Sequence, residues 1–309
     1  MRRVRFSEYG GPEVLRVEEV EAPRPGPGEL LVANEAIGVT LPTVRKVRDG
    51  GLPLPGALGG EVAGRVVAVG PEVTGFAVGD RVTALCFRDS YAEECVVAAA
   101  MATPVPDGAS AVDAVALVRG GLVASGAHAA ARPEPGESVL VTGAASGVGH
   151  LAVQLAKERG AARVVAAAGS AAKAEFLRSL GADEVVTYKD ASWGEPVDIV
   201  LDAVGGELLT PAVAALAPGG RLVAYSSGGG TVSAYDLLVG GKTVTGFQMA
   251  RIAATRPALV ESWRRELWTL FAEGRLRPSV HVRLPLAEAA TAHEIIESRA
   301  NLGKVVLIP

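Results

Sequence analysis

The sequence predicts an α/β protein of two domains, one built from short β-strands and one from a parallel sheet with helices. Short apolar runs alternate with Gly- and Pro-rich turns over the first hundred residues. From Glu137 onward, apolar strands alternate with helical stretches, which is the pattern of a parallel sheet. A length of 309 residues with a hydrophobic fraction of 49% is enough for two cores of ordinary size.

The first domain is expected over residues 1–112. Its strands include Leu30–Ala33, Val62–Val69 and Arg81–Leu85, and turn clusters such as Pro23–Gly28 separate them. Short, closely spaced strands with such turns are typical of a compact barrel.

The second domain is expected over residues 113–251. A helix that begins near Val148 carries apolar residues at helical spacing and ends at Gly160, and Ser170 is expected to cap the next helix. The candidate strands are Ser138–Val141, Arg163–Ala168, Glu184–Thr187, Val197–Leu201, Arg221–Ala224 and Thr243–Phe247.

The regular alternation ends near residue 250. We expect a helix around Ala258–Glu273, a strand at His281–Leu284, a helix from Leu286 to about Ser298, and a last strand at Lys304–Ile308. An apolar run at the very end of a chain is best explained as a strand that completes an earlier sheet. Residues 252–309 are therefore expected to complete the first domain.

Composition excludes several classes of protein. The net charge of −4 and a densest basic cluster of only Arg2, Arg3 and Arg5 argue against nucleic-acid binding. No segment reaches the roughly 18 uninterrupted apolar residues of a membrane helix, and the N-terminus lacks an apolar signal core. These features predict a cytoplasmic protein.

The cysteine and histidine content predicts neither a disulfide framework nor a metal site. Only Cys86 and Cys95 are present, without a Cys-x-x-Cys spacing, and the four histidines form no ligand motif. Both thiols are expected to be buried as small hydrophobic groups.

The strongest local motif predicts a dinucleotide site. A buried strand leads into small residues and then into an amphipathic helix, so that pyrophosphate can approach the backbone at the positive end of the helix dipole. Strand, loop and helix occur in the required order, which favours this interpretation over a merely tight turn. The expected phosphate-loop residues are Gly143, Ala144, Ala145, Ser146, Gly147, Val148 and Gly149.

The same Thr-Gly-x-x-x-Gly-x-Gly pattern is also similar to that of short-chain dehydrogenases. Those proteins usually carry it near the N-terminus and need a Tyr-x-x-x-Lys motif. Here it follows 141 residues, and none of the five tyrosines has a lysine four residues later. That alternative fails on both points.

Residues after the second strand of this domain predict NADPH rather than NADH. An NAD site places a carboxylate there, but no acidic residue occurs between Ala161 and Ala174. Gly169, Ser170 and Lys173 offer instead a hydroxyl and an ammonium for a 2′-phosphate, and Tyr188 is expected to pack on adenine.

Several motifs in order along the whole chain give a family resemblance. They are Leu58–Gly64, Gly79–Val82, Val105–Gly108, Pro135–Val141, Ala152–Lys157 and Glu297–Leu307. In these motifs the chain resembles the quinone oxidoreductase branch of the medium-chain dehydrogenases/reductases.

The resemblance implies a GroES-like β-barrel substrate domain, a Rossmann doubly wound parallel sheet that binds NADPH, and a homodimer. It implies no zinc, because Gly60 stands where zinc enzymes have histidine and the four-cysteine lobe is absent. It also extends the expected cofactor site to Val204, Ser226, Phe247, Gln248, Asn301 and Lys304.

Departures from the family pattern fall in the expected substrate region. Thr40–Lys46 replaces an Asn…Asp…Tyr cluster, and Gly120–Ala124 replaces Gln-Gly-x-Thr-Ala. We expect an acceptor pocket in the segment Thr40–Arg48 and around Arg119 that prefers polar or anionic compounds; the sequence does not assign both Arg45 and Lys46 to its interior. Its candidate residues are Thr40, Arg45, Lys46 and Arg119.

Three functions remain open. The first is an NADPH-dependent reductase that transfers hydride to quinones or α,β-unsaturated carbonyl compounds. The second is a dedicated enoyl reductase of a biosynthetic, polyketide-like pathway, whose domains share the Gly59–Val82 motifs. The third is a non-catalytic NADPH-binding sensor or structural protein. The sequence assigns a proton-transfer role to no residue.

Overall fold

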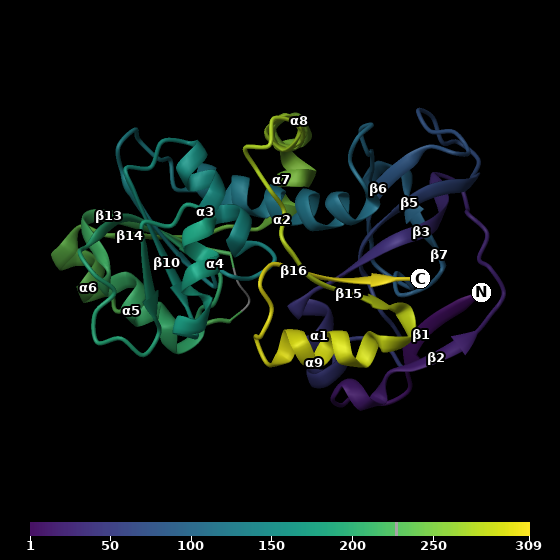
Figure 1. Cartoon of the computed structure of the whole chain (residues 1–309), viewed down its shortest axis with the longest axis horizontal. Helices are drawn as coiled ribbons and strands as arrows, with labels where there is room; N and C mark the ends of the chain where they lie inside the picture. The colour runs from purple at the N-terminus through teal and green to yellow at the C-terminus, as the bar shows by residue number, and fades with distance from the viewer. Residues whose placement is uncertain (226–227) are drawn as a thin grey trace. The chain divides into compact units, whose positions relative to one another are not determined.

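The computed structural model describes residues 1–225 and 228–309 and divides the chain into two units. The first comprises Met1–Arg119 together with Ser279–Pro309, and the second comprises Gly120–Pro278 (Figure 1). An α/β architecture with one mainly antiparallel and one parallel sheet is therefore confirmed.

The first unit is built on a large sheet with the strand order β15-β16-β3-β5-β6-β8, in which β7 also pairs with β3. A small sheet of order β2-β1-β4 completes it, and its helices are α1 (Leu41–Asp49) and α9 (Ala289–Glu297). The strands are β1 (Arg2–Phe6), β2 (Arg16–Glu19), β3 (Glu29–Val39), β4 (Gly56–Ala57), β5 (Gly60–Val69), β6 (Arg81–Cys86), β7 (Glu94–Ala98), β8 (Ala102–Pro104), β15 (Val280–Pro285) and β16 (Lys304–Ile308).

The end of the chain lies inside this sheet. Strand β16 pairs with β3 on one side, Val305 opposite Val39, and runs parallel to β15 on the other. In Figure 1 the yellow β16 and α9 accordingly lie among the purple elements of the N-terminal segment. Val305 and Leu307 are fully buried in the core of this unit. The last apolar residues thus complete an earlier sheet.

The second unit holds a six-stranded parallel sheet of order β11-β10-β9-β12-β13-β14. In chain order this is 3-2-1-4-5-6, the Rossmann arrangement, in which ligands bind at the carboxyl ends of the strands where the order reverses. The strands are β9 (Ser138–Thr142), β10 (Arg163–Ala168), β11 (Glu184–Thr187), β12 (Val197–Asp202), β13 (Leu216–Ala224) and β14 (Thr243–Gly246). The accompanying helices are α3 (Gly149–Glu158), α4 (Ala174–Ser179), α5 (Leu209–Ala214), α6 (Ala234–Gly240) and α7 (Met249–Thr255).

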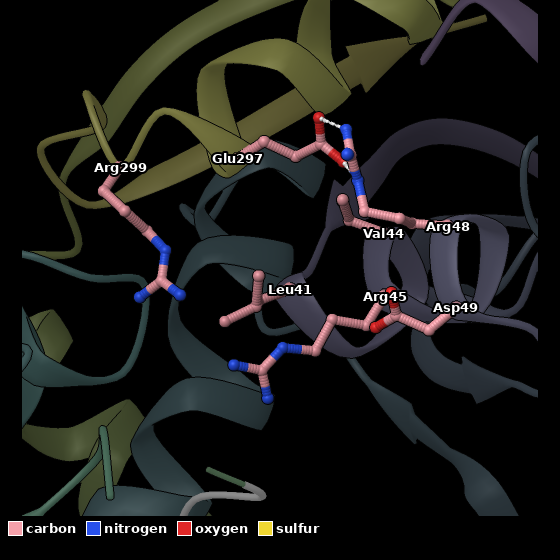
Figure 2. A pocket seen from close by; sticks show the side chains of 7 residues that line it. All are labelled: Leu41, Val44, Arg45, Arg48, Asp49, Glu297 and Arg299. Carbon is pink, nitrogen blue, oxygen red and sulfur yellow. Dashed lines mark hydrogen bonds and ion pairs between the residues drawn. The ribbon is translucent and has the colours of Figure 1, made fainter. Parts of the chain in front are cut away.

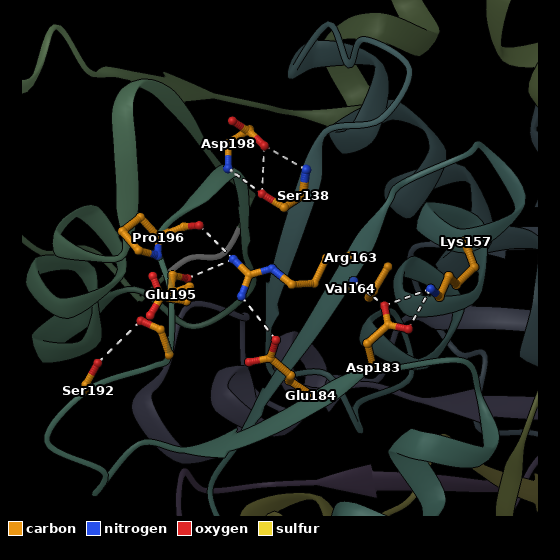
Figure 3. Close-up of polar contacts among 11 residues, drawn as sticks. Ser138, Lys157, Arg163, Val164, Asp183, Glu184, Ser192, Glu195, Pro196 and Asp198 are labelled. Carbon is orange, nitrogen blue, oxygen red and sulfur yellow. Dashed lines mark hydrogen bonds and ion pairs between the residues drawn. The ribbon is translucent and has the colours of Figure 1, made fainter.

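Polar side chains fix the amino ends of these strands (Figure 3). The Arg163 guanidinium donates to the Glu184 carboxylate at 3.1 Å and to the carbonyl of Pro196 at 2.6 Å. The Ser138 hydroxyl donates to Asp198 at 2.7 Å, which links β9 to β12. These contacts hold the amino ends of the strands together, whereas ligands of sheets with this strand order bind at the carboxyl ends.

The unit boundaries lie at 119/120 and 278/279, whereas the sequence placed them at 112/113 and 251/252. Two helices cause the difference. Helix α2 (Ala111–Ala130) runs unbroken past the expected boundary, and α8 (Pro257–Ala272) packs on it so closely that a Cβ on Gly121 would lie 2.7 Å from Leu267. The Arg159–Glu266 ion pair, at 2.9 Å, also ties α8 to the end of α3.

A buried ion pair links β16 to β5 across the strand β3 that lies between them. The Lys304 ammonium contacts the Glu61 carboxylate, and both residues are less than a tenth exposed. A Cβ on Gly38 of β3 would lie 2.4 Å from the Glu61 side chain, so the carboxylate fills the space that this glycine leaves. Burial lowers the pKa of Lys304 to about 7, while the adjacent carboxylate favours the charged ammonium.

We expect Lys304→Met to lower the free energy of unfolding by about 3–5 kcal/mol, because it leaves the Glu61 carboxylate buried without its partner. The double variant Glu61→Gln/Lys304→Met should lose clearly less, since no buried charge remains. Urea denaturation of the four proteins of this cycle measures the coupling. Additive losses would contradict a buried ion pair at this position.

Candidate cofactor and acceptor sites

The phosphate loop depends on a close approach between α3 and the residues that follow β9. Gly143 adopts a positive φ of 59°, which turns the chain sharply after the strand. A Cβ on Gly149 would lie 2.1 Å from the Gly143 carbonyl oxygen, so only glycine allows α3 to begin here. The N-terminus of α3 therefore lies at the carboxyl end of the sheet.

Ser146 stabilises this loop. Its hydroxyl oxygen accepts a hydrogen bond from the Gly149 N–H at 3.0 Å, and its own N–H donates to the Gly143 carbonyl at 2.9 Å. A serine in place of the family's glycine thus caps the first turn of α3. Within residues 1–225 and 228–309, the N–H groups of Gly147 and Val148 donate to no protein acceptor. Two such donors at a helix N-terminus suit a phosphate oxygen.

A buried contact that sequence reasoning missed links the two strands at the switch point. The Thr142 hydroxyl donates to the Asp202 carboxylate at 2.7 Å, and the same carboxylate accepts from the N–H groups of Val204 and Gly205. Asp202 thereby fixes the turn after β12 and places Val204 beside Gly143, since a Cβ built on Gly143 would lie 3.4 Å from the Val204 side chain. The sequence contains a signal for this contact, because the polar residues Thr142 and Asp202 end two adjacent parallel strands.

The residues expected to select the 2′-phosphate lie at the end of β10. The Ser170 side-chain oxygen accepts from the Ala172 N–H at 3.2 Å, so Ser170 caps a 3-10 turn (Ala171–Lys173) that leads into α4. Its hydroxyl proton remains available for a phosphate oxygen. Lys173 lies in this same turn, and the stretch contains no carboxylate.

Tyr188 lies across the carboxyl ends of β9 and β10. Its hydroxyl accepts from the Gly143 N–H at 2.8 Å and donates to the Ala167 carbonyl at 3.3 Å. Its ring lies 3.8 Å from a Cβ built on Gly169. The phenol thus connects the phosphate loop with the segment that carries Ser170.

The other residues expected at the cofactor site lie outside the phosphate loop and outside the segment that follows β10. The Phe247 ring lies against α2, only 2.2 Å from a Cβ built on Gly126, and Gln248 is exposed before α7. Asn301 is buried and donates to the Gly303 carbonyl at 2.8 Å, while Lys304 pairs with Glu61. Ser226 lies outside the described residues.

Two of the expected acceptor residues belong to the region of α1: Thr40 lies at the start of the helix, and Arg45 lies on one of its faces. Thr40 is buried, and its hydroxyl lies 3.1 Å from that of Thr43. Lys46 is exposed and does not line the cavity that Arg45 lines. Arg119 is half-buried in α2, and burial lowers the pKa of its guanidinium.

A cavity of about 330 Å³ lies beside α1 in the first unit (Figure 2). Of the four expected acceptor residues, Arg45 lines it, and α9 with Arg299, two residues beyond its end, supplies part of the wall. Sequence reasoning could not bring Glu297 and Arg299 to this place, because they lie about 250 positions after α1. The lining comprises Leu41, Val44, Arg45, Arg48, Asp49, Glu297 and Arg299.

The described ranges offer zinc no ligand set, since they hold no cluster of three or more His, Cys, Asp or Glu side chains suited to a metal. Cys86 and Cys95 are buried. Burial lowers the pKa of His128, His150 and His293 to about 4, so these imidazoles are neutral near pH 7. Among the helices described, none is both long and apolar enough to cross a bilayer.

Two family models match the chain. The alcohol dehydrogenase GroES-like domain covers residues 26–132, and the zinc-binding dehydrogenase model covers residues 147–265. Both expected domains are thereby confirmed as types.

Individual proteins match over the full length. A quinone oxidoreductase of Pseudomonas aeruginosa is 34% identical over 100% of this chain and 99% of the relative. A 2-haloacrylate reductase of a Burkholderia species is 31% identical over 97% and 96%. A mycobacterial protein solved in complex with NADPH superimposes with a TM-score of 0.92 at 33% identity, over 100% of both chains.

The Rossmann strand order, the phosphate loop and these full-length similarities agree with one another. They also agree with the family that the sequence motifs indicated. The chain belongs to the quinone oxidoreductase-like branch of the medium-chain dehydrogenase/reductase family, whose members here are oxidoreductases.

Proposed function

We propose that this protein is an NADPH-dependent, zinc-independent oxidoreductase that reduces a quinone or an α,β-unsaturated carbonyl compound. The observation that carries this proposal is the phosphate loop, in which Gly147 and Val148 present two N–H donors at the N-terminus of α3. Ser170 and Lys173 lie in a stretch that has no acidic residue between Ala161 and Ala174, and a hydroxyl and an ammonium suit the 2′-phosphate of NADPH. A related protein bound to NADPH supports the same choice.

The bound nicotinamide supplies the hydride, and the residues of this chain bind and orient the reactants. A reduced quinone or enone develops negative charge on oxygen as hydride arrives, so the site needs a donor for that oxygen. Without zinc, the candidate is the Arg45 guanidinium. The Thr40 hydroxyl donates to Thr43, whose own proton goes to the Gly59 carbonyl, so Thr40 could serve only after this contact breaks. The final proton of a quinone product can come from water.

The acceptor class follows from the relatives. A quinone and a 2-haloacrylate are both conjugated electrophiles, and 34% and 31% identity to reductases of these two compounds favour a conjugated acceptor here. The reaction proposed is hydride addition to that acceptor.

A homodimer is part of the proposal. Strand β14 forms one edge of the parallel sheet, and α6 in the same unit exposes about 70% or more of Tyr235, Leu238 and Val239. An unpaired strand edge beside exposed apolar side chains favours pairing with a second copy of the chain.

Purified protein should consume NADPH with a quinone, an alkenal or a cyclic enone, and should keep this activity after exhaustive chelation. Chelation should leave the activity unchanged because none of the described residues form a zinc site. Absorbance at the NADPH wavelength, followed across an acceptor panel, measures both outcomes. Activity that disappears together with stoichiometric zinc would contradict the proposal, as would NADPH binding without turnover of any acceptor.

Lys173→Ala should raise the dissociation constant for NADPH about tenfold to a hundredfold and leave that for NADH nearly unchanged. A charge-assisted contact to phosphate contributes about 1.5–3 kcal/mol, and NADH lacks that phosphate. Calorimetric titration of both cofactors checks this. Arg265→Ala, at an exposed position on α8, is the charge-matched control. Equal binding of the two cofactors by the unmodified protein would remove the basis for the assignment.

Leu238→Lys should convert the dimer into a monomer, because it places a charge in the exposed apolar face of α6. Sedimentation at micromolar concentration gives the mass. Phe87→Lys, at a similarly exposed apolar residue in the first unit, should leave the mass unchanged. A monomeric unmodified protein would refute this part of the proposal.

A further inference from the structure

We propose that Cys86 and Cys95 form a reversible redox-modification site, in which a peroxide joins the two thiols of one chain in a disulfide between β6 and β7. This inference does not depend on the proposed reductase activity. Both residues are free thiols, and the chain contains no third cysteine that could compete for either of them.

The two thiols belong to strands that are not paired with each other. Cys86 ends β6 and lies opposite Gly60 of β5, whereas Cys95 lies in β7 opposite Val32 of β3. Strands β6 and β7 nevertheless contact each other, and both cysteines belong to the same buried core. The first unit therefore brings two thiols from the two ends of one turn into a common interior.

Polar contacts place the two sulfur atoms close together. The Cys86 thiol lies 3.5 Å from the carbonyl oxygen of Val96, the residue that follows Cys95, and 2.8 Å from that of Arg88. The Cys95 thiol lies 3.4 Å from the Asn34 amide oxygen, and the two thiols also have a hydrogen-bond interaction with each other. Thiols that already interact can be joined without a large movement of the backbone.

The surroundings make the two thiols unequal. The interaction with the Cys95 thiol lowers the pKa of Cys86, and the backbone and charge of Arg88 act in the same direction. The interaction with Cys86 and burial raise the pKa of Cys95 well above its ordinary value. Because the thiolate is the form that attacks a peroxide, Cys86 is the residue oxidised first, and Cys95 remains a thiol that can then react with it.

Cys86 lies directly behind a surface turn. Cys86 is 3% exposed and Cys95 is fully buried, but the next two residues, Phe87 and Arg88, are exposed. Within residues 1–225 and 228–309, the N–H groups of Phe87, Arg88 and Asp89 donate to no backbone carbonyl. The turn can therefore open locally while the sheet stays paired, which gives a molecule as small as hydrogen peroxide a path to Cys86.

The reaction consists of two balanced steps. The Cys86 thiolate attacks one oxygen of hydrogen peroxide, so that an S–O bond forms, the O–O bond breaks and hydroxide leaves. The Cys95 thiol then attacks the sulfenic sulfur of Cys86, so that the S–S bond forms and the S–O bond breaks, and the thiol proton leaves with the hydroxyl group as water. Two thiols are oxidised and one peroxide is reduced, and a thiol reductant reverses the change.

Intact mass spectrometry of the folded protein tests the site. Hydrogen peroxide should lower the mass of the reduced protein by about 2 Da, both thiols should become unreactive toward a maleimide together, and dithiothreitol should restore both. Peptide mapping should find the bond between Cys86 and Cys95 of the same chain. Oxygen added to either cysteine without a disulfide, a disulfide between two chains, or no reaction of either thiol in the folded protein would overturn the proposal.

Cys95→Ser and Cys86→Ser separate the two roles. Without the Cys95 thiol, the sulfenic acid should persist at Cys86, react with dimedone and proceed to sulfinic acid. In Cys86→Ser, the raised pKa of Cys95 should leave that thiol unreacted. Cys86→Ala and Cys95→Ala, which bury no hydroxyl, repeat the test where a serine variant does not fold. Capture of Cys95 by dimedone in the absence of Cys86 would contradict the assigned order.

The melting temperature shows whether the native fold accommodates the bond. The bridge closes the turn that contains Ser90, whose N–H and hydroxyl donate to the Leu58 carbonyl at 2.8 Å and 3.0 Å. A cross-link that fits the folded chain restricts mainly the unfolded chain, so the oxidised protein should melt at a higher temperature than the reduced protein. Neither single variant should show this rise. A lower melting temperature of the oxidised protein would mean that the bond forms at the expense of the fold, and would refute the site.

Discussion

The contact between Gly149 and the Gly143 carbonyl is the constraint on which the cofactor site depends. Because α3 can begin only where no side chain intervenes, its first N–H groups lie directly beyond the end of β9. Ser146, Tyr188 and the Thr142–Asp202 bond then fix the loop around that helix end. A larger residue at 149 would move the helix away and remove the donors that face a phosphate.

The first unit depends on a different constraint, the return of the chain end to its sheet. Since β16 is held between β15 and β3 and its Lys304 pairs with Glu61, the preceding α9 is brought against α1. The cavity beside these helices therefore combines residues near positions 45 and 299. The Arg48–Glu297 ion pair joins the two helices directly at this cavity.

The sequence predicted the second unit well because its elements are defined by local patterns. The strand Arg163–Ala168 and the strand Glu184–Thr187 have the expected bounds, and Ser170 is the expected cap. The unit boundaries differ because the attachment of α8 to α2 is a packing contact that periodicity does not encode. The contact between Arg48 and Glu297 was not predicted for a related reason, since it joins segments about 250 residues apart. Once α1 is known to be a helix, its spacing alone separates Arg45 from Lys46.

These two kinds of constraint leave the phosphate loop and the cavity beside α1 with different freedom to change. The phosphate loop works through backbone groups, so nearly every substitution at Gly143 or Gly149 disturbs it. The cavity beside α1 works through side chains on one helix face, and each can change without moving the helix. Arg45 illustrates this freedom, because it adds charge to the cavity while Val44 and Val47 on the same helix remain buried in the core. Substitutions can therefore change the lining of the cavity while the phosphate loop keeps its form.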